Sequence, residues 1–236
     1  MFNNAYLDRP ILPKPSKPRY TLRAPEREVA FRQENITREK TRLFLKPHGN
    51  AQSQDAYRIT DEEGVSVFTA TGQKFNDRSC RELRDASGLP LCDMHKKPLS
   101  SPFSWVVTLP GSKPNDAAAV IAKATPQWSW TSVDLSFTFR NSAAVETKGE
   151  DEKDVSLRAK KHGHVLAFFD IVDTDRRVAE ARESISNNEK LALRRNTRGV
   201  NRRPALDLVI APGMDMSLVS SLPIIRMQAN LGIRWW

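Results

Sequence analysis

The sequence predicts an all-β barrel or sandwich of about twelve strands with one apolar helix near its C-terminal end. Short runs of β-branched and aromatic residues recur between turn signals from residue 42 onward, which is typical of β-hairpins in series. One later segment, residues 216–231, is instead apolar on almost every side. The chain has 236 residues, enough for one large domain with a buried core.

Tight turns separate several of the expected strands. Two turns have the form Asp-x-x-Gly, at residues 61–64 and 85–88, in which the Asp side chain accepts backbone hydrogen bonds and Gly takes a positive φ. A third turn is expected at residues 173–176. The expected strands are 42–46, 57–60, 65–70, 80–84, 89–94, 104–109, 118–124, 132–140, 155–160, 165–171, 177–182 and 206–210.

The segment 216–231 follows a turn and a capping residue, Asp215, and reads as a helix. A helix that is apolar all round lies in a protein core or in lipid. About 16 residues span only roughly 24 Å, short of a bilayer, and Arg226 would have to enter the membrane. We therefore expect a helix inside a closed barrel, although Pro223 should kink it. Its expected core residues are Met216, Leu218, Val219, Leu222 and Ile225.

The formal net charge is +9, and it is unevenly distributed. Residues 1–40 carry nine Lys and Arg against five Asp and Glu, together with five of the fifteen prolines, and residues 176–203 carry nine against three. We expect a basic, Pro-rich, flexible arm over residues 1–40 and one domain over residues 41–236. Polar insertions interrupt that domain near residues 141–154 and 186–203.

Several function classes lack their usual signals. No apolar run reaches the roughly 18 residues of a transmembrane helix, and no signal peptide is recognisable, so we expect a cytoplasmic protein, with a peripheral membrane or nuclear location left open. The two cysteines, Cys80 and Cys92, suit reduced thiols. The motifs for acyl transfer, phosphate cradling, dinucleotide binding and zinc proteolysis are missing. We expect no enzyme activity, no cofactor and no metal.

Basic side chains on consecutive expected strands are the candidate binding site. Adjacent-strand pairing could bring them within reach of one phosphorylated lipid head group. A solvated basic face is the alternative. The candidate head-group residues are Lys74, Arg81, Arg84, Lys96 and Lys97.

Several short motifs follow one another in a recognisable order and spacing. They are Ile59-Thr60-Asp61-Glu62-Glu63-Gly64, Val67-Phe68, Gly72, Arg84-Asp85-Ala86-Ser87-Gly88-Leu89-Pro90-Leu91, Lys96-Lys97, Trp105, Arg177-Val178-Ala179-Glu180 and Val209-Ile210-Ala211-Pro212-Gly213-Met214-Asp215. This series resembles the LURP-one-related family over most of residues 41–232. The resemblance implies a tubby C-terminal-like fold, also found in phospholipid scramblases: an all-β, twelve-stranded closed barrel around a hydrophobic C-terminal helix.

The resemblance and the charges together predict a non-enzymatic binding or scaffold protein. Tubby-type domains are known for phosphoinositide binding, so the leading expectation is reversible association with phosphoinositide-containing membranes, with Trp235-Trp236 as an interfacial anchor. The alternative is a nucleic-acid-associated or transcription-linked regulator that uses its basic arm. A scramblase-like lipid translocation ranks third. No protein partner is predicted.

Overall fold

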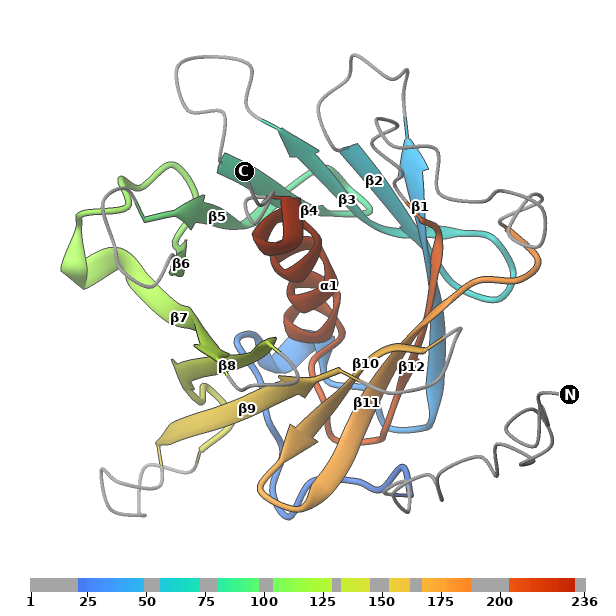
Figure 1. Cartoon of the computed structure of the whole chain (residues 1–236). Helices are drawn as coiled ribbons and strands as arrows, with labels where there is room; N and C mark the ends of the chain where they lie inside the picture. Colours follow the sequence, from blue (N-terminus) through green and yellow to red (C-terminus); the bar gives the residue numbers. More distant parts are fainter. Residues whose placement is uncertain are drawn as a thin grey trace, which may run out of the picture.

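The computed structural model describes residues 21–48, 56–72, 80–97, 104–128, 133–144, 153–161, 167–187 and 204–231. The expected all-β class is confirmed: twelve antiparallel strands form a closed barrel in which β1 pairs with both β2 and β12 (Figure 1). The strands are β1 Thr41–His48, β2 Ala56–Thr60, β3 Ser66–Gly72, β4 Cys80–Asp85, β5 Pro90–Lys96, β6 Trp105–Thr108, β7 Val120–Trp128, β8 Val133–Arg140, β9 Asp154–Lys160, β10 Ala167–Asp173, β11 Arg176–Glu183 and β12 Leu206–Ile210. Two short 3-10 helices, Gln33–Asn35 and Ala117–Ala119, precede β1 and β7 respectively.

Side chains alternate between the interior and the outside of the barrel, as the two-residue period of a strand requires. In β1, Leu43 and Leu45 are buried, and they lie opposite Leu208 and Leu206 of β12 where the barrel closes. Strand β9 repeats the pattern, with Val155, Leu157 and Ala159 buried and the residues between them exposed. This alternation fixes the register, because a one-residue slip would expose every apolar side chain.

The helix α1, Met216–Leu231, lies inside the barrel, in red in Figure 1. Of the residues expected to form its core face, Leu218, Val219, Leu222 and Ile225 are fully buried, and Met216 packs against the core while partly exposed. Burying one such side chain contributes about 1.5–3 kcal/mol. Pro223 is accommodated within the helix. Within the described part of the chain, no helix has the length and apolar character needed to cross a membrane.

The two ends of the barrel can be told apart by which strands begin there and by where α1 begins. We call the end at which β1 and the other odd-numbered strands begin the entry end, because α1 also starts there; the opposite end is the exit end. The three expected turns all lie at the entry end. In the second of them, Asp85 Oδ1 accepts hydrogen bonds from the N–H groups of Ser87 and Leu89, each at 2.9 Å. Gly88 has a φ of +87° there, as its turn type requires.

Residues 21–40 lie across the entry end, which shifts the expected domain boundary at residue 41. Val29 and Ala30 are completely buried. The Val29 N–H donates to Gly213 O at 2.9 Å, and Val29 O accepts from the Asp215 N–H at 2.9 Å. The folded unit therefore includes residues that composition assigned to an arm. Residues 1–20 lie outside the described residues.

Asp215 joins this segment to the helix. Its Oδ1 accepts from the Ser217 N–H and hydroxyl, both at 2.6 Å, and from the Leu218 N–H at 3.3 Å, so it caps α1 as expected. Its Oδ2 accepts from the N–H groups of Phe31 and Arg32 at 2.9 and 3.0 Å. Burial raises the pKa of this carboxyl, and the donors oppose that shift. One side chain thus satisfies buried backbone groups from two distant segments.

Candidate anion-binding surface

Cationic side chains gather around the rim of the exit end. They come from strands on different sides of the barrel, namely β1, β2, β5 and β9, with one residue beyond each of the last two strands. Each is exposed or half-buried. The set consists of Lys46, Arg58, Lys96, Lys97, Arg158, Lys160 and Lys161, and we call it the exit rim. Among the described residues, the carboxylates at this end that are not buried are Glu82, Asp134, Glu183 and Asp207. The buried Asp93, Asp170 and Glu180 lie at the level of Glu82 and Lys160.

The turns of the entry end carry carboxylates, namely Asp61, Glu62, Glu63, Asp85, Asp116, Asp154, Asp173 and Asp175. The same end also carries cations, namely Arg42, Arg84, Lys113, Arg140, Lys153 and Arg176. The described segment 21–40 adds five basic and four acidic residues there, so it changes the net charge of the entry end by only one unit. Counted over the residues that the structure describes, the barrel therefore has a positive exit end and a nearly neutral entry end. A charge distribution of this kind orients a protein as it approaches an anionic surface.

The structure does not gather the five predicted head-group residues into one site. Lys74 lies outside the described residues. Arg81 has only 2% of its surface exposed and shares the inward face of β4 with Leu83. Its Nη1 donates to Cys80 O at 2.7 Å. A guanidinium inside the barrel does not reach a lipid head group.

Arg84 and the two lysines lie at opposite ends of the β4–β5 hairpin. Arg84 pairs with Pro90 beside the entry-end turn, whereas Cys80 pairs with His95 beside the lysines. Strand geometry separates these pairs by roughly 13–17 Å. Arg84 is also occupied, since its Nη2 donates to both Glu82 carboxylate oxygens at 2.9 Å and its Nη1 to Gly88 O at 2.7 Å. Lys96 and Lys97 thus remain from the predicted set, as part of the exit rim.

The outer face of β4, β5 and β6 holds a buried polar group that the sequence did not reveal. His95 Nε2 lies 3.2 Å from Thr108 Oγ1 and 4.0 Å from Cys80 Sγ. Asp93 Oδ2 accepts from the Gly111 N–H at 2.8 Å, and burial raises the pKa of this carboxyl. No cluster of His, Cys, Asp or Glu in the described ranges is arranged to hold a metal ion. The contacts of His95 and Asp93 instead suit this polar group to holding the 109–119 connection against the barrel.

A second buried network lies on the outer face of β10 and β11. Asp170 and Glu180 stand directly opposite each other across the two strands, a pairing that is unfavourable between like charges. Arg177 Nη1 lies 3.5 Å from Asp170 Oδ1 and 3.0 Å from Glu180 Oε2, and Arg182 also binds Glu180. Sequence spacing could not reveal this network, because a register shift between Ile171 and Val172 brings Arg177 onto this face.

A closed antiparallel barrel with a buried helix along its interior defines the class of this protein: it has a tubby-like fold. The chain belongs to the LURP-one-related family, whose model matches residues 41–227. A search of curated proteins gives no match. Among solved structures, the chain is similar to an X-ray structure of an Arabidopsis thaliana protein, with 16% sequence identity and a TM-score of 0.48 over 84% of this chain and 95% of that one.

Proposed function

We propose that this protein is a non-enzymatic binding protein that associates reversibly with phosphoinositide-containing membranes through the exit end of its barrel. The observation that supports this proposal is the distribution of charge between the two ends. The cations of the exit rim surround the barrel mouth, whereas acidic turns occupy the entry end. A ring of cations complements a plane of phosphates better than it complements one small anion.

The expected energetics suit a reversible contact. A Lys or Arg near an anionic leaflet contributes about 1 kcal/mol, and this attraction is limited to roughly one Debye length of about 8 Å at physiological salt. Only the end that faces the bilayer benefits, because strands of seven or eight residues hold the other end roughly 25 Å away. Ile185, 70% exposed just beyond β11, adds an apolar contact at the same end. Among anionic lipids, the tubby-like fold favours phosphoinositides by analogy.

Vesicle sedimentation tests the orientation directly. The double variant Lys96→Glu, Lys97→Glu reverses two charges of the exit rim, and Lys40→Glu, Lys113→Glu reverses two exposed charges at the entry end as a matched control. On phosphatidylcholine vesicles containing a phosphoinositide, the first variant should lose at least about tenfold in affinity, since each removed charge is worth about 1 kcal/mol. The control should bind within about twofold of the wild type.

Three results would count against the proposal. Equal losses in both double variants would mean that binding follows net charge and not the exit end. Equal binding to all anionic lipids would remove the phosphoinositide preference. Tight binding to DNA or RNA, with no lipid binding at any salt concentration, would favour the nucleic-acid role instead.

A further inference from the structure

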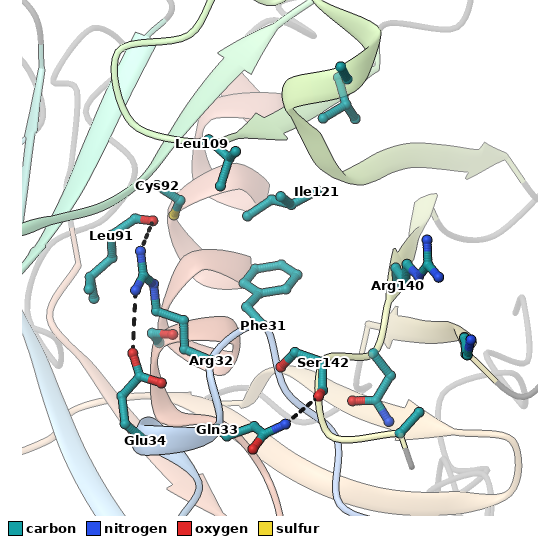
Figure 2. A pocket seen from close by; sticks show the side chains of 16 residues that line it. Phe31, Arg32, Gln33, Glu34, Leu91, Cys92, Leu109, Ile121, Arg140 and Ser142 are labelled. Carbon is teal, nitrogen blue, oxygen red and sulfur yellow. Dashed lines mark hydrogen bonds and ion pairs between the residues drawn. The ribbon is translucent and has the colours of Figure 1, made fainter. Parts of the chain in front are cut away.

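A cavity of about 940 Å³ opens at the entry end between residues 31–34 and strands β5 to β9 (Figure 2). Its volume lies within the range of small-molecule sites, roughly 300–1,000 Å³. The cavity reaches two buried residues, Cys92 of β5 and Ser217 in the first turn of α1. It is therefore a depression that reaches into the protein and not a shallow surface.

Hydrogen bonds between distant segments hold the walls in place. Asn141 Oδ1 accepts from the Ala30 N–H at 2.9 Å, and its Nδ2 donates to Glu28 O at 2.8 Å. The Ser142 N–H donates to Ala30 O at 2.9 Å. Phe31 packs edge-on against Phe139 with ring centroids 5.1 Å apart. The cavity is preformed, so a ligand would not have to order these walls.

One side of the cavity is apolar. Figure 2 shows Leu109, Ile121 and Cys92 together, with Phe31 beside them. Leu109 is 47% exposed, an unusual exposure among the large apolar side chains that the structure describes. An apolar ligand group on this wall would remove Leu109 from water, a gain of about 25 cal/mol for each Å² buried.

Cationic side chains also line the cavity. Arg140, at the end of β8, has no ion-pair or hydrogen-bond partner among the described residues, although Asp154 is its neighbour across the strands. Arg32 differs, because Glu34 lies 3.3 Å from it. Lys153 also lines the cavity. Three cations against one carboxylate favour a ligand with a negative charge.

From this juxtaposition we infer that the cavity binds a single-chain amphiphile with an anionic head group, a fatty carboxylate or an alkyl phosphate. The head group lies at Arg140 and the alkyl chain lies along Phe31, Leu109 and Ile121. The inference is independent of the proposed membrane contact, which uses the opposite end of the barrel. Failure of either one leaves the other intact.

Isothermal titration calorimetry on the full chain tests this site with defined probes below their micelle concentrations. Dodecanoate and dodecyl phosphate carry the two head groups and distinguish a fatty acid from a phosphorylated lipid. Dodecyltrimethylammonium has a comparable chain with the opposite charge, and acetate has the head group without the chain. Wild-type protein should bind at least one anionic amphiphile and neither control.

The variants assign the binding to this cavity. Arg140→Gln and Leu109→Ser should each weaken binding by about tenfold, whereas Lys113→Gln, an exposed entry-end residue outside the lining, should bind within about twofold of wild type. Methyl NMR shifts of Leu109 and Ile121 on titration, with thermal unfolding of each variant, separate lost contacts from lost folding. Binding of neither anion, equal binding of the cation, or unchanged binding in folded Arg140→Gln and Leu109→Ser would overturn the inference.

Discussion

The entry and exit ends of this barrel are built from the same antiparallel strands but are organised by different forces. At the entry end, distant segments meet through short buried hydrogen bonds, with Asp215 linking residues 31 and 32 to the start of α1. At the exit end, the described residues display an exposed ring of cations. The comparison teaches that stability depends chiefly on the entry end, whereas charge-dependent binding is expected at the exit end.

The largest effect should follow removal of the whole entry-end segment. Deleting residues 1–40 takes away Val29, Ala30 and Phe31, exposes the apolar surface beneath them and leaves buried donors of residues 213–215 without acceptors. We expect a loss above about 5 kcal/mol, enough to unfold an ordinary domain. Urea unfolding followed by circular dichroism measures it. Deleting only residues 1–20 is the control, and similar stability of both truncations would return the domain boundary to residue 41.

The next largest effect should come from Asp215 alone. Asp215→Ala leaves the N–H groups of Phe31, Arg32, Ser217 and Leu218 without their acceptor. We expect a loss of about 3–5 kcal/mol in the free energy of unfolding. Asp116→Ala is a suitable control, since Asp116 caps an exposed 3-10 turn at the same end and should cost about 1 kcal/mol. Equal losses would show that Asp215 is not a special link.

At the exit end, substitutions should hardly change the free energy of unfolding. Lys96→Ala and Lys97→Ala together should change the free energy of unfolding by less than about 1 kcal/mol, because both side chains lie at the surface. Vesicle binding should fall in the same protein. A folded variant with unchanged binding would remove these two lysines from the exit rim, while a large loss of stability would blur the distinction between the two ends.

The smallest expected effect is the contribution of Asp85 to the pH dependence of stability. The Ser87 hydroxyl, which donates to Asp85 Oδ1 at 2.7 Å, lowers the pKa of Asp85 below its usual value of 3.8. The stability contributed by this ionised carboxylate is present above pH 3.8 and is lost as the pH falls through its lower folded-state pKa. Unfolding measured between about pH 2 and pH 5 should show a shallower acid dependence in Asp85→Asn. An unchanged slope would contradict the assignment.

Residue patterns predicted the parts of the fold that repeat. Alternating apolar positions such as Leu43 and Leu45 marked the strands, and the all-round apolar character of α1 marked its burial. The prolines and charges of residues 1–40 concealed the anchoring of Val29, because its contacts are backbone hydrogen bonds to residues almost two hundred positions away. Composition does not report contacts of that kind.

The predicted site was only partly recoverable for a similar reason. Arg81 and Arg84 are three residues apart in β4, so the two-residue period of a strand alone places them on opposite faces. Packing decides which of them is inside: Arg81 is buried on the face of Leu83, and Arg84 lies outward. The cavity at the entry end also escaped prediction, since Phe31, Leu109 and Arg140 come from separate parts of the chain.

The pairing of β1 with β12 has a consequence for how the chain folds. Thr41 lies opposite Ile210, and the helix that fills the interior follows later still. During synthesis the first eleven strands emerge before β12, which closes the barrel, and before α1, which fills it, so their apolar faces stay exposed to water until then. Pairing strands so far apart in the sequence has a large entropic cost of loop closure, and this slows folding. We therefore expect nascent chains of this protein to depend on chaperones until translation has passed the helix.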